Sequence, residues 1–320
     1  MADSSIVSTR GFSLDLAWHH LVARSVAAWH NLSSPDPDSI DLWTGLLQGC
    51  TSLDDFLGGG TSGAMLWFFQ RRSSFMGQNA MMKWNRESLD DYILLPAANG
   101  FVMRKECFFL SHSWHTSNHP DPRGEHLRFA QQTLDLQHWS YIWVDWTCAP
   151  QEPRSLSEQA YFSKTLTSMP AIIRNCGFMC YYPTFKPRLW VLYEIAEYCL
   201  TCTTDLEFHQ TWDTKVFAKH IQEMSRDGIH AVIDKYDYAC TYERDKSLIV
   251  SQLDLLMLLK RLDVSMISIR RLLGHLVWSP GIRDYYGQHA DEVIILKPKI
   301  GSLVYNGKQY SYTPVVPHFE

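Results

Sequence analysis

C-F-F-L-S-H-S-W-H, from Cys107 to His115, is the first of three apolar runs that end abruptly in polar residues. The second run, Y-I-W-V-D-W, extends from Tyr141 to Trp146, and the third, G-F-M-C-Y-Y-P, extends from Gly177 to Pro183. Helix-length segments separate the runs. Short apolar strands separated by helices are typical of a parallel α/β sheet. The sequence therefore predicts three neighbouring strands, with a helix from Arg188 to Leu200 after the third.

The polar residues at the ends of these runs mark the expected ligand site. In open α/β sheets, ligands bind beyond the carboxyl ends of the strands. The ends of the first two runs carry histidine, tryptophan and aspartate side chains. We expect these side chains, Tyr182 at the end of the third run, and the start of the following helix to surround one hollow.

Composition excludes several classes of function. The 320 residues are 46% hydrophobic and 20% charged, with a formal net charge of -5. This balance is that of an ordinary globular protein, and it does not indicate a nucleic acid or an anionic membrane as a partner. The sequence shows no signal-peptide pattern and no apolar run long enough to span a bilayer. We therefore expect a cytoplasmic protein whose 8 cysteines are reduced thiols.

Aromatic content is high, with 12 Trp, 15 Tyr and 15 Phe. A tryptophan side chain is large, and its indole N–H needs a hydrogen-bond partner when it is buried. Two interpretations remain open. Most of these rings fill the core, or some of them line an apolar pocket for a bulky ligand.

The N-terminal hundred residues read as helices. Apolar residues recur at helical spacing from Gly11 to Asn31, where Ser13 is a candidate cap, and from Ile40 to Gln48. A third helix is expected from Thr61 to Arg72. The glycines from Gly58 to Gly60 do not form a phosphate-binding loop, because no strand precedes them and no Lys-Ser or Lys-Thr follows.

The C-terminal third is expected to contain three helices and a hairpin. The helices cover Thr214 to Asp227, Ser247 to Leu262 and Val264 to Val277. Residues 293–296 and 303–312 alternate like strands, and Asn306-Gly307 is a strong signal for a type I′ hairpin turn. The predicted organisation is a helical N-terminal extension (1–100), an α/β core (101–205) and a helical region with a C-terminal β-hairpin (206–320).

Three motifs in the core resemble fungal heterokaryon-incompatibility (HET) domains and their Toll/interleukin-receptor (TIR) relatives. Phe109 to Trp114 resembles the opening strand of these domains. Tyr141 to Asp145, with Cys148 and Gln151, is similar to the HET signature Y-(I/L)-W-(I/V)-D…C…Q. Arg188 to Glu194 resembles the R-x-W…E helix that HET and TIR domains share. The resemblance covers about a third of the chain and implies a TIR/flavodoxin-like parallel sheet.

The resemblance also singles out Glu194, which matches the glutamate of TIR-type enzymes that cleave NAD. Cleavage of the nicotinamide glycosidic bond passes through a cation-like ribose, which a nearby carboxylate can stabilise without a metal. The alternative is a structural glutamate. Asp145 has two interpretations as well. It orients a ligand hydroxyl or a histidine, or it accepts backbone N–H groups of the following turn.

His112, His115 and His119 lie close together in the sequence after the first strand. Histidine can donate a proton or a hydrogen bond near neutral pH. Their spacing, together with Cys148, matches no known zinc pattern, so we expect no metal and no other cofactor. Cys148 also lacks an identifiable base that would make it a nucleophile.

Three hypotheses for function follow. The first is a cofactor-free cyclase of fungal specialised terpenoid metabolism, a pericyclase of the intramolecular Diels–Alder type, because a HET-like protein is known among fungal pericyclases. Such an enzyme needs an apolar pocket that folds a small apolar substrate, and one or two hydrogen-bond donors. The expected catalytic residues are Glu194, His112 and Asp145. The expected substrate-binding residues are Ser113, Trp114, His115, Trp146, Cys148, Tyr182, Trp190 and Tyr193.

The second hypothesis is a TIR-like NAD glycohydrolase in which Glu194 is central and Trp114 or Trp190 stacks on a base. The third is a non-catalytic HET-type signalling module that self-associates. Loss of NAD turnover in a Glu194→Ala variant would favour the second over the first. The sequence does not name the substrate or the oligomeric state.

Overall fold

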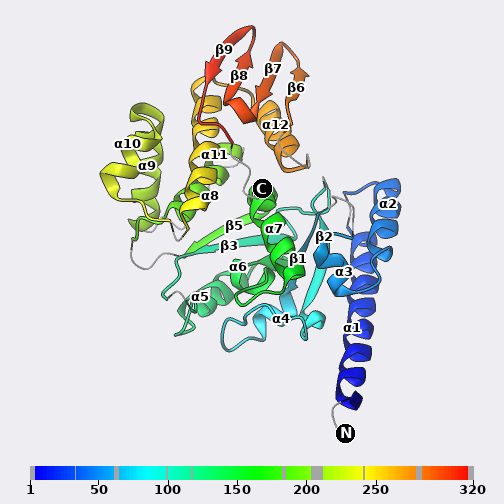
Figure 1. Cartoon of the computed structure of the whole chain (residues 1–320). Coiled ribbons are helices and arrows are strands. Elements are labelled where there is room, and N and C mark those ends of the chain that lie inside the picture. The colour runs from blue at the N-terminus through cyan, green and yellow to red at the C-terminus, as the bar shows by residue number, and fades with distance from the viewer. Residues whose placement is uncertain are drawn as a thin grey trace. The chain divides into compact units, whose positions relative to one another are not determined.

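The chain folds into two compact units, seen here in a computed structural model (Figure 1). Unit 1 comprises Met1–Leu110 and Trp114–Met179, and unit 2 comprises Ser111–Ser113 and Cys180–Glu320. The structure describes residues 4–32, 34–60, 65–98, 100–116, 118–181, 185–202, 212–240, 242–278 and 283–315. Helices and two sheets confirm the expected α/β class.

The larger sheet contains the three strands that the sequence predicts, as neighbours. Its order is β2-β1-β4-β3-β5. Strand β3 pairs in parallel with β4, which places Phe109 opposite Trp143. Strand β1, however, is antiparallel to both β2 and β4, so the sheet is mixed rather than purely parallel. The strands are β1 (Leu66–Arg71), β2 (Tyr92–Pro96), β3 (Cys107–His112), β4 (Tyr141–Trp143) and β5 (Gly177–Tyr181).

Strand β1 corrects the sequence interpretation, which expected a helix from Thr61 to Arg72. A short, continuously apolar segment that is buried on both faces has no distinctive period, so periodicity cannot separate a strand from a buried helix. Every residue from Leu66 to Gln70 is buried. The Tyr161 hydroxyl accepts a hydrogen bond from the Phe68 N–H and donates one to the Leu66 carbonyl, at 3.1 Å each. These bonds pair the part of β1 that the short β4 leaves without a neighbour.

Helix α1 (Ser4–His30) covers edge strand β2 (Figure 1). The Ser25 hydroxyl accepts a hydrogen bond from the Leu94 N–H at 2.9 Å, and the Trp29 indole donates to the Leu94 carbonyl at 2.8 Å. These side chains pair backbone groups that an open sheet edge would expose to another chain. The helix begins before the predicted Gly11, so Ser13 lies inside it and does not cap its start.

The remaining helices of unit 1 surround the sheet. Phe68 on β1 packs against Phe56 and Tyr161. A second core cluster joins β3 and β4 to the helix after β3 through Leu110, Ile142 and Leu127. These helices are α2 (Pro37–Gln48), α3 (Leu53–Gly58), α4 (Arg72–Met76), η1 (Leu89–Asp91), α5 (Glu125–Leu134), α6 (Asp145–Cys148) and α7 (Leu156–Asn175).

Unit 2 is built around helix α8 (Leu189–Thr201), most of whose residues are buried. Helix α8 packs against α9, α11 and α12 (Figure 1). The predicted helices at Thr214, Ser247 and Val264 are confirmed, with ends that differ by a few residues. These helices are α9 (Trp212–Asp227), α10 (Ile229–Tyr236), α11 (Glu243–Arg261) and α12 (Met266–Trp278).

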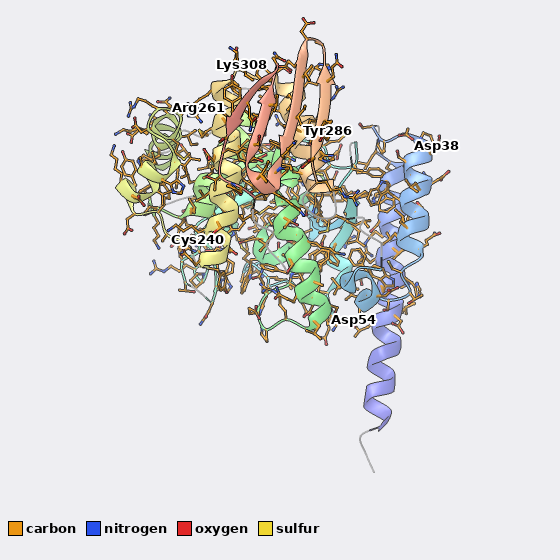
Figure 2. The ribbon with its side chains drawn as sticks, turned by 45° about the horizontal axis from the view of Figure 1, so that its top comes forward. Asp38, Asp54, Cys240, Arg261, Tyr286 and Lys308 are labelled. Carbon is orange, nitrogen blue, oxygen red and sulfur yellow. The ribbon has the colours of Figure 1, made fainter. Side chains whose placement is uncertain are left out.

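A four-stranded antiparallel sheet closes unit 2, in the order β6-β7-β8-β9. Asn306 and Gly307 join the last two strands with φ values of 48° and 81°, which confirms the predicted type I′ turn. Tyr286 on β6 and Lys308 on β9 mark the two edges of this sheet (Figure 2). The elements are β6 (Tyr285–His289), β7 (Glu292–Lys297), η2 (Pro298–Ile300), β8 (Ser302–Tyr305) and β9 (Lys308–Ser311).

Candidate functional site

The carboxyl end of β3 meets a carboxylate of α8 within unit 2. The Ser111 hydroxyl donates a hydrogen bond to Glu194 Oε2. Ser111 is buried, whereas Glu194 is only partly buried. Ser113 follows two residues after Ser111 and is also buried. We call Ser111, Ser113 and Glu194 the strand-end cluster.

Alternation along β3 decides which side chains join this cluster. Successive side chains of a strand point to opposite faces of its sheet. Ser111 therefore shares a face with Phe109, whose ring stacks on Trp143 at 5.0 Å. His112 shares the opposite face with Leu110, which belongs to the core cluster that includes α5. The sequence hypothesis grouped His112 with Glu194, and that grouping stays a prediction.

A second carboxylate on α8 is one that sequence reasoning missed. Glu197 is 1% exposed and accepts a hydrogen bond from the Tyr193 hydroxyl at 3.2 Å. Its spacing from Glu194, three residues along a helix, was the available signal. Tyr193 was expected to contact substrate, but its own side chain is 1% exposed and its hydroxyl is engaged by Glu197.

Trp190, another expected binding residue, is engaged in a similar way. Its indole N–H donates to Asp245 Oδ2 at 3.3 Å, and its ring packs edge-on against Tyr193 at 6.2 Å. Asp245, in the first turn of α11, is buried. Trp190 therefore ties α8 to α11, which helps to hold the helix that carries Glu194.

Unit 1 holds a separate group of the predicted residues. The Trp114 indole donates to Asp145 Oδ2 at 2.9 Å, and Asp145 Oδ1 accepts the backbone N–H of Trp146 at 2.6 Å. The ring of Trp146 packs edge-on against Trp114 at 5.3 Å and lies 5.3 Å from the ring of His119. We call Trp114, His119, Asp145 and Trp146 the loop cluster. The Asp145 contacts match the turn-acceptor interpretation of this residue.

His115, an expected substrate-binding residue, pairs with a histidine that sequence reasoning missed. Nε2 of His115 lies 3.2 Å from Nε2 of His126, which is fully buried at the start of α5. His119 instead accepts the Asp121 N–H on Nδ1 at 2.9 Å. His126 carries no local sequence signal, because it lies on a helix eleven residues away. Within the described part of the chain, no group of three or more His, Cys, Asp or Glu side chains is arranged to hold a metal ion.

Asp121 fixes the loop between β3 and α5. Its carboxylate is 1% exposed and accepts the N–H groups of Glu125 at 2.7 Å and Leu127 at 2.9 Å. We expect Asp121→Ala to lower the free energy of unfolding of the protein by about 2 kcal/mol, because two first-turn amides of α5 lose their acceptor. Urea denaturation followed by circular dichroism measures the change. A loss below about 0.5 kcal/mol would contradict this role.

Cys148 was expected to contact substrate, but it is fully buried next to the Ile142 carbonyl. Burial raises the pKa of its thiol to about 11. We expect iodoacetamide to modify Cys148 at pH 8 at least about 100-fold more slowly in the native protein than in guanidinium, because only the thiolate reacts. Mass spectrometry of the alkylated peptide measures both rates. Equal rates would show an accessible, reactive thiol.

None of the eight cysteines, all of which lie in the described part of the chain, forms a disulfide bond there. Burial raises the pKa of Cys180 to about 12, and the charges of Cys199 and Glu194 act in the same direction. The pKa of Cys199 is raised to about 12 for the same main reason. Tyr182, the remaining predicted binding residue, lies outside the described residues.

Comparison of the chain with protein-family models, curated proteins and solved structures found no match in any of the three. The resemblance to HET and TIR domains therefore stays a prediction that rests on the three sequence motifs. Among the described helices, none combines the length and apolar character needed to cross a membrane.

Proposed function

We propose that the chain hydrolyses the N-glycosidic bond between nicotinamide and ribose in NAD, with Glu194 as the catalytic carboxylate. The contact between Ser111 and Glu194 supports this proposal most directly. It places a carboxylate beside the carboxyl end of a central strand, where ligands of α/β sheets bind. The motif that resembles the R-x-W…E helix contains the same glutamate.

The chemistry requires a negative charge where positive charge develops. When the bond between ribose C1′ and the nicotinamide nitrogen breaks, the electron pair leaves with nicotinamide and the ribose becomes cation-like. The Glu194 carboxylate stabilises that cation, and the Ser111 hydroxyl holds the carboxylate in place. Water then adds to C1′ and releases a proton to solvent, so NAD and water give ADP-ribose, nicotinamide and a proton.

Three of the side chains expected to bind the cyclase substrate already donate hydrogen bonds to acceptors within the protein. The Trp114 indole donates to Asp145, the Trp146 indole to the Met81 carbonyl and the Tyr193 hydroxyl to Glu197. A cyclase would have to break these contacts before the donors could reach a substrate carbonyl. The geometry therefore favours the glycohydrolase, and the cyclase and the signalling module stay predictions.

Incubation of the purified full chain with NAD tests the proposal. Chromatography should show nicotinamide and ADP-ribose in equal amounts, increasing linearly with protein concentration. A preparation that releases no nicotinamide above the rate of a buffer blank, while it is folded by circular dichroism, would overturn the proposal.

A further inference from the structure

The Ser113 hydroxyl is a buried polar group that finds no hydrogen-bond partner within the described part of the chain. Ser113 is 5% exposed, and its Oγ has no hydrogen-bond partner among the described residues. A buried hydroxyl that makes no hydrogen bond is disfavoured, because folding removes the water that would otherwise pair with it. Such a group lowers the stability of the fold unless a ligand supplies the missing hydrogen bond.

The position of Ser113 relates this hydroxyl to the strand-end cluster. His112 is in strand conformation, so the side chains of Ser111 and Ser113 leave the chain on the same side. Ser111 donates to Glu194 on that side. We therefore expect the Ser113 hydroxyl and the Glu194 carboxylate on the same side of the end of β3.

The chemistry of the two groups selects the ligand. A carboxylate accepts hydrogen bonds, and a serine hydroxyl can both donate and accept. A phosphate is negatively charged at neutral pH, so the Glu194 carboxylate repels it. A sugar hydroxyl donates to the carboxylate and accepts from the serine, and the 2′- and 3′-hydroxyls of a ribose supply two such groups on neighbouring carbons.

We infer that Ser113 binds the ribose hydroxyls of a nucleotide substrate beside Glu194 and so selects ribose over deoxyribose. This inference deepens the proposed function and rests on it for the identity of the substrate. The Ser113 hydroxyl contributes to substrate binding, whereas the Glu194 carboxylate stabilises the positive charge that develops at ribose C1′.

Ser113→Ala tests the role of the hydroxyl. We expect the melting temperature to stay the same or rise, because Ser113 Oγ makes no hydrogen bond to the described residues that the change would remove. We expect the KM for NAD to rise about 10-fold with kcat changed less than about 2-fold, as for a group that binds ground state and transition state alike. Ser251→Ala is the matched control, since the buried Ser251 hydroxyl donates to the Leu248 carbonyl within α11. It should leave the KM unchanged.

The ribose assignment has a separate test. Wild-type protein should cleave NAD at least about 10-fold more efficiently than the analogue that lacks the 2′-hydroxyl on the nicotinamide ribose, and Ser113→Ala should lose most of that preference. A melting temperature several degrees lower for Ser113→Ala, or an unchanged KM and preference, would overturn the inference.

Calorimetric titration with ADP-ribose separates this inference from the proposed function. Binding that weakens about 10-fold in Ser113→Ala, without any NAD turnover by the wild type, would uphold the ribose site and reject the glycohydrolase. NAD turnover with equal ADP-ribose affinity in wild type and variant would reject the role of Ser113 alone. Wild-type protein that neither binds ADP-ribose nor turns over NAD would reject both.

Discussion

Replacement of Glu194 by glutamine is expected to lower the kcat for nicotinamide release about 100- to 1,000-fold. Glutamine has nearly the same shape and can still accept the Ser111 hydrogen bond, so the local structure should persist. What it lacks is the negative charge, which stabilises the ribose cation only as the bond breaks. Loss of an interaction made mainly in the transition state lowers kcat with little change in KM.

Glu243→Gln provides the matched control for Glu194→Gln. The Glu243 side chain is 86% exposed on α11, so the same chemical change occurs at the surface. This variant should keep wild-type kcat. Initial rates with NAD at several concentrations, on proteins with the same melting temperature, give kcat and KM separately. Retention of more than a tenth of wild-type kcat by Glu194→Gln would show that this carboxylate is not catalytic.

Glu292→Gln should produce the largest loss of stability among conservative substitutions in unit 2, about 2 kcal/mol at pH 7. The Glu292 carboxylate on β7 accepts the Ser265 N–H at 2.7 Å and its hydroxyl, the Ser268 hydroxyl at 2.6 Å and the Tyr305 hydroxyl at 3.0 Å. It thereby joins the start of α12 to two strands. Hydrogen bonds to a charged group each contribute about 1.5–3 kcal/mol, and glutamine keeps only part of them.

The same contacts predict how stability changes with pH. Burial alone would raise the pKa of Glu292, but the hydroxyl and backbone donors of Ser265, Ser268 and Tyr305 outweigh it and lower the pKa from 4.5 to about 2. The folded state therefore binds this proton less readily than the unfolded state. Its contribution is complete above about pH 4.5 and disappears as the pH falls towards 2.

Urea denaturation of the wild type and Glu292→Gln between pH 7 and pH 3 measures this effect. The difference in free energy of unfolding should be largest at pH 7 and should shrink below pH 4.5. Glu243→Gln, at its exposed position, should match the wild type at every pH. A difference that stays constant with pH would show that the charge of Glu292 does not contribute.

Local sequence patterns predict the elements whose residues carry their own signals. The Asn306-Gly307 turn is predictable because both residues tolerate positive φ, and the strands on either side alternate. The apolar runs that became β3 and β4 end where polar residues begin. Strand β1 was assigned wrongly because Leu66 to Gln70 are buried on both faces, which removes the alternation that marks a strand.

The candidate site, too, was only partly predictable from the sequence. Glu194 could be selected from the sequence because it lies within a motif that resembles those of HET and TIR domains. Its contact with Ser111 joins residues 83 positions apart, and the pairing of His115 with His126 depends on where α5 begins. His112 and Ser111 are adjacent in the chain, but a strand turns their side chains to opposite faces.

The amino-acid order alone is enough to specify an α/β protein with three adjacent strands, a terminal hairpin and a glutamate in the helix that follows the third strand. Each of these elements is marked by residues close together in the chain, and the spacing of apolar and polar residues reveals it. Folding in three dimensions determined that Ser111 meets Glu194 and that the Ser113 hydroxyl finds no hydrogen-bond partner among the residues that the structure describes. It also determined that Trp114, Trp190 and Tyr193 are engaged by acidic side chains. Those outcomes depend on which segments, distant in the sequence, pack together and remove polar groups from water. No pattern within one short stretch of sequence predicts that packing.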